Sequence, residues 1–393
     1  MSPLTPGPVQ LPHDILVIIV SIVARDDPNC VSIKKCSLVC HDLLHLCRKY
    51  IYRSVVPPRF PSRSTALMIQ KRLSAAPEIG AYIQNLDLDV KVHDLANDWL
   101  IESFKKITGL KQLALQLPWL DGGVHPWSYI LVQPALLYLI QLPTLTHLTL
   151  SHIDNFYLPD LAPCVNLKHL TLKSLRYHPD IEYPIRPLPS KPMRLSNLAI
   201  VSMHRPEIDD LCAWHCAGGK PFVDFDSLKR LSYGMDDRWD LSAVRRLLAF
   251  CGSLIGIRLT FDVGGLGTYE GRLAEMLLPK LVTLKHLSLS IALDHSRPLC
   301  AFFRELDRMT NNIIETLEIR VCLDPSPYQA DKFGEDCASL DTLLTKPVWQ
   351  QLRKVSLSFV RRGDAGEALD LPGMHFPKLS SSPFISLKVN ASG

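Results

Sequence analysis

The sequence predicts an α/β chain: a short N-terminal unit of three helices, followed by an irregular solenoid with one strand and about one helix per repeat of about 30 residues. Three observations predict this fold. Apolar residues follow helical spacing near the N-terminus, a short apolar pattern recurs ten times after it, and helical stretches follow several of the copies. Hydrophobic residues make up 47% of the chain and charged residues 21%, which excludes a wholly disordered protein.

The first predicted element is a helix that begins near residue 12. Residues 1–10 hold three prolines and are expected to form a disordered leader. Pro12 suits the first turn of a helix, and Asp14 favours its positive end. One apolar stripe follows at helical spacing: Ile15, Ile18, Ile19 and Ile22.

Two further helices complete the unit 11–56. Ser32 is expected to cap the second helix, and the third carries Leu43, Leu44, Cys47 and Ile51. Three helices in so few residues give a small core, so a unit of this size commonly needs a partner or a docked neighbour.

A stiff linker, Pro57–Pro61, and an entry helix are expected over 57–80, and the repeats over 81–379. Each repeat begins with an apolar residue, and apolar residues follow three and five positions later. The ten copies begin at Ile83, Leu110, Leu145, Leu167, Leu195, Leu228, Leu254, Leu284, Ile314 and Leu352. The alternation at the end of each copy predicts a short strand, and helices are expected over 241–250, 273–278 and 299–309. Residues 380–393 are expected to be a tail.

Stacking the repeats would align the strands as a parallel sheet with the apolar positions in the core. Side chains alternate across a strand, so the intervening residues should point out along a concave wall. These residues are small, polar and mixed in charge, which suits recognition of a protein surface or peptide better than a sealed catalytic pocket. The candidate target-binding residues are Gln112, His147, Thr149, His169, Thr171, Arg230, Arg258, His286, Ser288, Glu318 and Arg320.

Residues 11–53 contain a recognisable sequence motif. It opens with Leu11-Pro12-x-Asp14-Ile15 and continues with Cys36-Ser37-Leu38-Val39-Cys40 about 25 residues later. This segment resembles an F-box, the adaptor-binding motif of substrate receptors in Skp–cullin–F-box ubiquitin ligases, and is similar to the F-box proteins that are numerous in fungi. An F-box followed by degenerate leucine-rich repeats is a common layout of that family. Leu43 stands where the family usually has Trp, and among the repeats only Cys322 matches the usual Asn or Cys position.

The resemblance implies a non-catalytic receptor without a cofactor or metal. Its F-box would dock on a Skp-type adaptor, and through it on a cullin, while the array holds a target protein for ubiquitination. The residues that the resemblance places against the adaptor are Leu11, Pro12, Ile15, Ile22, Leu38, Val39, Cys40 and Leu43. A repeat scaffold without any ligase association is the alternative.

Other patterns are weaker. Cys36-x-x-x-Cys40-His41 and Cys212-x-x-x-Cys216 lack the paired spacing of structural zinc sites, and Cys36 and Cys40, on one helical face, are expected to pack in the core. The glycine-rich segment Gly264–Gly271 is expected to be a loop between repeats rather than a dinucleotide-binding turn. The proline-rich segment Tyr177–Met193 is expected to be a surface loop, with partner binding as the alternative.

Charge and hydropathy bound the partners and the compartment. The net charge is +4 and no basic run exceeds two residues, so no nucleic-acid partner is expected. The longest apolar run is shorter than the roughly 20 residues of a membrane span. Eleven scattered cysteines are expected to be free thiols, so the protein is expected in the cytoplasm, the nucleus or both.

Overall fold

The structure is a computed structural model, and it describes residues 11–27, 29–56, 64–94, 99–118, 127, 130–175, 191–201, 216, 221–235, 240–261, 273–293, 299–309, 311–323, 330–361 and 376–392. The chain divides into two compact units, Met1–Leu148 (unit 1) and Thr149–Gly393 (unit 2).

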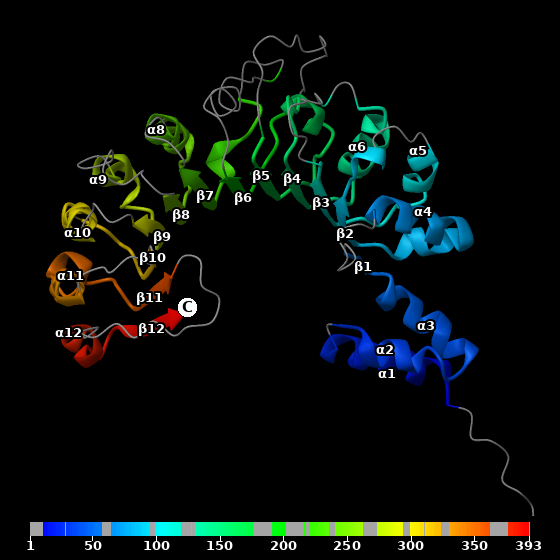
Figure 1. Ribbon diagram of the computed structural model, residues 1–393, viewed down its shortest axis with the longest axis horizontal. Helices are drawn as coiled ribbons and strands as arrows, with labels where there is room; N and C mark the ends of the chain where they lie inside the picture. Colours follow the sequence, from blue (N-terminus) through cyan, green and yellow to red (C-terminus); the bar gives the residue numbers. More distant parts are fainter. Residues whose placement is uncertain are drawn as a thin grey trace, which may run out of the picture. The chain divides into compact units, whose positions relative to one another are not determined.

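The described residues form a twelve-stranded sheet in which spatial order follows chain order from β1 to β12. Neighbouring strands pair in parallel, for example β9 with β10 and β10 with β11. Sequential parallel strands require a connection that returns across the sheet, and helices supply it in most repeats (Figure 1). The predicted α/β class is confirmed, and the arrangement is compatible with a repeat solenoid.

Unit 1 begins with three helices and continues into the first strands of the sheet. The main-chain N–H groups of Gln84 and Asn85 both donate to the carbonyl oxygen of Arg53 at 2.9 Å, and β1 pairs with β2. The described elements are α1 (His13–Asp26), α2 (Val31–Cys36), α3 (His41–Ile51), β1 (Ser54–Val55), α4 (Thr65–Ala75), η1 (Pro77–Tyr82), β2 (Asn85–Asp89), η2 (Val92–Asp94), α5 (Trp99–Phe104), β3 (Gln112–Gln116), α6 (Gln133–Ile140) and the start of β4 (His147–Ser151).

Unit 2 repeats strand and helix more regularly towards its C-terminal end, where α8 to α12 lie along the same side of their strands (Figure 1). The helices expected over 241–250, 273–278 and 299–309 are present as α8, α9 and α10, and the expected tail contains β12. Its described elements after β4 are η4 (Leu158–Leu161), β5 (His169–Lys173), β6 (Asn197–Val201), η5 (Phe225–Ser227), β7 (Arg230–Met235), α8 (Asp240–Phe250), β8 (Gly256–Phe261), α9 (Leu273–Leu277), η7 (Leu278–Lys280), β9 (His286–Leu293), α10 (Leu299–Asp307), β10 (Thr316–Leu323), α11 (Ala330–Leu344), η8 (Pro347–Trp349), β11 (Lys354–Arg361), α12 (Pro377–Ser381) and β12 (Ser386–Ser392).

The repeat pattern marks the core. All thirty apolar positions of the ten copies are buried, and none is more than 3% exposed. In the second copy, for example, these positions are Leu110, Leu113 and Leu115, and the latter two lie on β3. Burial of this row in every copy gives the sheet a continuous apolar layer and fixes its register.

Several side chains form hydrogen bonds with the backbone of a neighbouring repeat. Thr144 Oγ1 donates to the Leu110 carbonyl at 2.7 Å, and Asn312 Nδ2 donates to the Val348 carbonyl at 3.0 Å. The buried carboxylate of Glu305 in α10 accepts from the Ala274 N–H in α9 at 3.1 Å. These bonds satisfy backbone groups that would otherwise be buried without partners.

Asp341 accepts two such bonds in the C-terminal repeats. It lies in α11, is 2% exposed, and accepts the N–H groups of Lys378 at 3.0 Å and Leu379 at 2.8 Å in the first turn of α12. Replacing Asp341 by Ala leaves two N–H groups without this acceptor, so we expect a loss of about 2 to 3 kcal/mol in the free energy of unfolding. Urea denaturation measures it.

Asp307→Ala is the matched control for Asp341→Ala. Asp307 forms an ion pair with Lys346 at 2.5 Å, and both side chains are partly exposed to solvent. An exposed pair of this kind contributes about 1 kcal/mol or less. Equal losses in the two variants would show that Asp341 has no special capping role.

Candidate functional site

The first candidate surface lies on α1, which is apolar on two opposite faces. One face carries Val20, which is buried, with Val23 and Ala24 packed beside it. The other face carries the stripe Ile15, Ile18, Ile19 and Ile22, each between 42% and 52% exposed. A helix that is apolar on both faces is normally covered on both.

The three helices enclose a very small core. Within the described residues of 11–53 only Val20, Ile33 and Cys47 are fully buried. Partly buried side chains surround them: Val23, Ala24, Cys30, Cys36, Leu43, Leu46, Tyr50 and Ile51. The unit therefore exposes more large apolar side chains than it buries.

Seven of the eight residues expected to face an adaptor are solvent-exposed in unit 1: Leu11, Pro12, Ile15, Ile22, Leu38, Val39 and Cys40. Leu38 and Val39, in the turn after α2, are 85% and 72% exposed. Leu43 differs, because it packs against the core of the helical unit. The expected set omits the exposed Ile18, Ile19 and Val31, although the helical stripe already contained the first two.

The N-terminus of α2 is capped by Asp27 and not by the expected Ser32. The Ser32 N–H donates to the Asp27 carboxylate, and the Ser32 side chain makes no cap, because Cys30 rather than Ser32 precedes α2. Asp27 therefore satisfies an N–H group in the first turn of α2 from outside the helix.

Of the first suspected zinc hook, Cys36 packs against the core of this unit, whereas Cys40 is exposed, so the expected core packing is wrong for Cys40. Burial raises the pKa of the Cys47 thiol, and the nearby Cys36 and Cys40 raise it further. Across the part of the chain that the structure describes, no three His, Cys, Asp or Glu side chains form a group that could hold a metal ion. Cys212 of the second hook, the segment Gly264–Gly271 and most of Tyr177–Met193 lie outside the described residues.

The second candidate surface is the outward face of the unit 2 strands. The parallel register aligns the outward residues in rows, so Arg230 is followed across the sheet by Gly256, His286, Thr316 and Lys354. Seven of the expected target-binding residues lie in two such rows. One row contains His169, Arg230 and His286, and the next contains Thr171, Arg258, Ser288 and Glu318.

Three of these side chains contact one another. Arg258 Nε donates to Ser288 Oγ at 3.2 Å, and its guanidinium lies 3.6 Å from the Glu318 carboxylate. Arg320, also in the expected set, lies two residues further along β10 in the next row. Neighbouring repeats thus build one continuous polar surface.

The remaining expected residues lie on earlier strands. Gln112 pairs with Asn85 in unit 1, so the register does not align it with the rows of unit 2. His147 and Thr149 lie on β4. Burial lowers the pKa of His147, which favours the neutral imidazole, and a ring nitrogen lies 2.9 Å from Thr146 Oγ1.

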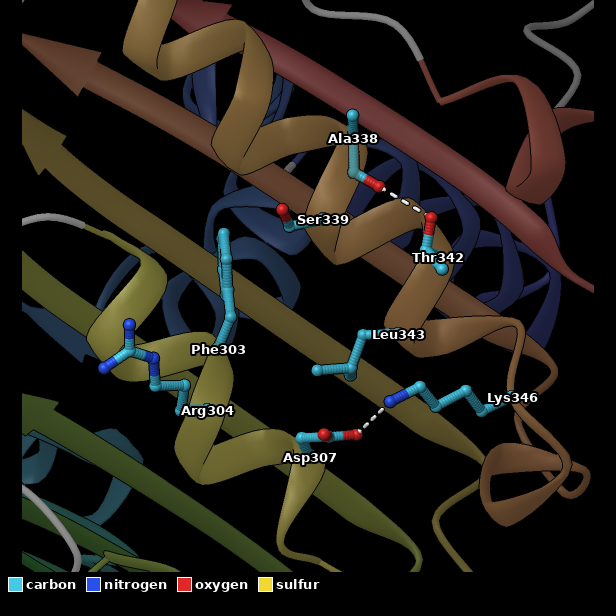
Figure 2. Close-up of a pocket in the computed structure, with 8 residues that line it drawn as sticks. All are labelled: Phe303, Arg304, Asp307, Ala338, Ser339, Thr342, Leu343 and Lys346. Carbon is cyan, nitrogen blue, oxygen red and sulfur yellow. Dashed lines mark hydrogen bonds and ion pairs between the residues drawn. The ribbon is translucent and has the colours of Figure 1, made fainter.

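A cavity of about 610 Å³ opens between α10 and α11 (Figure 2). Its lining is Phe303, Arg304, Asp307, Ala338, Ser339, Thr342, Leu343 and Lys346. The Asp307–Lys346 ion pair crosses it, and the hydroxyls of Ser339 and Thr342 donate to main-chain carbonyls of α11. Because these hydroxyls are engaged within the helix, the lining does not present a nucleophile with an adjacent base.

Comparison with models of known protein families gives no match for this chain, and a search of curated proteins finds no relative. Among the described helices, none is both long and apolar enough to span a bilayer.

Proposed function

We propose that the protein is the substrate-recognition subunit of a Skp–cullin–F-box ubiquitin ligase. Its N-terminal helical unit binds a Skp-type adaptor, and its strand face binds the target. The observation that carries the proposal is the exposed stripe Ile15, Ile18, Ile19 and Ile22, which lies on a helix whose opposite face is already in the core. Exposed apolar side chains gathered in this way are typical of protein–protein interfaces.

The turn residues Leu38 and Val39 support the same assignment, because they are the most exposed large apolar side chains of the three-helix unit. Leu38 and Val39 belong to the F-box-like motif over 11–53, and they give the helical unit a second contact for the adaptor. Burying a half-exposed Ile or Leu side chain contributes about 1 kcal/mol, so several of them supply a stable interface.

In this function no side chain of the chain does chemistry. The receptor holds a target lysine near the ubiquitin-loaded enzyme that the cullin recruits, and the rate rises because the two reactants stay close together. The strand face must then bind tightly enough to outlast a transfer and weakly enough to release the product.

Co-expression of the full chain with a Skp-type adaptor tests the proposal. We expect the two to co-elute as a one-to-one complex in size-exclusion chromatography. A monodisperse chain that does not retain the adaptor in this experiment would contradict the proposal.

A repeat scaffold without an adaptor is the second candidate, and one feature of unit 1 favours it. β1 covers the edge of β2, and Arg48 forms an ion pair with Glu78 at 3.2 Å, so the N-terminal segment is tied to the sheet. A terminal cap of this kind protects a solenoid edge.

Deleting residues 1–51 separates the two candidates, because it removes the three helices and keeps Arg53 and β1. The ligase proposal predicts that this deletion abolishes adaptor binding while the sheet still unfolds cooperatively. The scaffold candidate predicts that the deletion lowers the melting temperature by several degrees, and that neither the full chain nor the shortened chain binds the adaptor. Differential scanning calorimetry and an adaptor pull-down on both chains measure these outcomes.

A further inference from the structure

The strand face of unit 2 carries a large excess of positive charge. Among the described outward residues of β5 to β12, one is acidic, Glu318, whereas six exposed residues are basic: Lys173, Arg230, Arg258, Arg320, Lys354 and Lys388. Five of these eight strands are preceded by a charged residue, and the trend continues there, with Glu315 against Lys168, Lys229, Lys285 and Arg353. The whole chain has a net charge of only +4, so this charge is concentrated on one surface.

Both carboxylates of this surface are already engaged. Glu318 pairs with Arg258 at 3.6 Å, and Glu315 pairs with Lys285 at 2.9 Å. The hydrogen bond from Lys285 lowers the pKa of Glu315, and the nearby Arg353 and His286 add to this effect. Within the described residues no ion pair is found for the other eight basic side chains of the surface.

The rows place these cations at intervals across neighbouring strands. Arg230 and Lys354 belong to one row, and Arg258 and Lys388 belong to the next. Like charges on one face repel each other, so such a surface is stabilised when an anionic partner covers it.

Between the cations lie hydroxyl side chains, which form hydrogen bonds with the main chain of a bound peptide. Hydroxyl groups occupy Thr171, Ser232, Ser288, Thr316 and Ser356, and they accept and donate hydrogen bonds. Among the described outward positions of β5 to β12, none is Phe, Tyr or Trp, because Tyr233, Phe261 and Phe359 point into the core. Single-stranded nucleic acids are usually held by stacking on such aromatic rings, so the face suits a protein better than an RNA.

We propose that the target site on this face recognises an acidic protein segment, rich in Glu or Asp and extended across the strands. The inference rests on the proposed function, since it gives the chemical class of the target that the strand face holds. The seven steps from β5 to β12, at about 4.8 Å each, correspond to about ten residues of extended chain.

Fluorescence anisotropy on the full chain, purified with a Skp-type adaptor, tests the inference. The probe is a fluorescein-labelled peptide of about ten residues that alternates Glu and Ser, and the control peptide carries Gln in place of Glu. We expect binding of the Glu peptide alone, and we expect it to weaken about tenfold or more between low salt and about 0.3 M salt, because screening shortens the range of these charges.

Two double variants with equal changes in net charge locate the site. Arg230→Glu with Lys354→Glu reverses two cations of one row, and we expect binding of the Glu peptide to fall about tenfold or more. Arg245→Glu with Arg304→Glu reverses two exposed cations on α8 and α10, and we expect binding to change about twofold or less. Equal losses in both variants would overturn the inference, because net charge alone would then explain binding.

Two other results would also overturn it. One is equal binding of the Gln peptide. The other is tighter binding of a labelled single-stranded RNA of the same length, lost in the Arg230→Glu/Lys354→Glu variant. Adaptor retention in the same samples separates the two proposals: a complex that keeps the adaptor and ignores the Glu peptide refutes the acidic target alone, whereas a chain that binds the peptide without the adaptor refutes the ligase role alone.

Discussion

Replacing Ile18 and Ile19 together by glutamate is expected to lower the affinity for a Skp-type adaptor about 100-fold or more. Both side chains lie on the outer face of α1, 52% and 42% exposed, and make up the middle of the apolar stripe. Two carboxylates buried against an apolar partner without hydrogen-bonding groups cost several kcal/mol, which exceeds the loss of the apolar contacts alone. Isothermal titration calorimetry with the purified adaptor measures the change.

The matched control places the same charges on exposed apolar residues of unit 2. Val165 and Val282 are 71% and 62% exposed, so Val165→Glu with Val282→Glu should leave adaptor affinity and the circular dichroism spectrum unchanged. A similar loss of affinity in both double variants, or full affinity in the Ile18→Glu/Ile19→Glu variant, would show that α1 is not the adaptor surface.

The repeat core could be predicted from the sequence because one constraint acts on every copy. A position such as Leu148 or Leu287 must be apolar, since its side chain enters the layer between sheet and helix. The same constraint sets where each strand begins, whereas β9, β10 and β11 run four residues beyond the last apolar position of their repeats. The stripe on α1 was also visible as helical spacing, although the residues selected from it by resemblance left out its most exposed member, Ile18.

Contacts between residues that are far apart in the chain could not be predicted from the sequence. Lys168, Lys229 and Lys285 each stand just before a strand in their own repeat, and the parallel pairing of successive strands gathers them at one edge of the sheet. The outward strand residues were expected to be mixed in charge, whereas the strand face of unit 2 is basic. The Asp341 cap on α12 likewise joins residues far apart in the chain, and no local sequence pattern predicts it.

Gly80→Ala is expected to destabilise unit 1 by about 3 kcal/mol or more, the largest single-residue effect we foresee on stability. Gly80 is buried in η1, and a Cβ atom there would lie well inside van der Waals contact of the Lys106 carbonyl oxygen. The neighbouring Gly109 faces the Ala81 carbonyl in the same way, where a Cβ would lie 2.8 Å from the oxygen. Two backbone segments thus approach each other with no room for a side chain, and backbone cannot move aside as a flexible side chain does.

Gly256→Ala is the matched control for Gly80→Ala. A Cβ atom at Gly256 would lie 3.5 Å from Arg230 Cγ and 3.6 Å from His286 Cβ, which is ordinary van der Waals contact. This substitution is expected to be neutral or to stabilise unit 2 by about 0.5 kcal/mol, because Ala loses less backbone entropy on folding than Gly. Hydrogen exchange measured by mass spectrometry separates the units. Gly80→Ala should speed exchange in β2 and β3 and leave β8 to β10 protected, whereas unchanged protection of β2 would show that the contact between Gly80 and Lys106 is not tight.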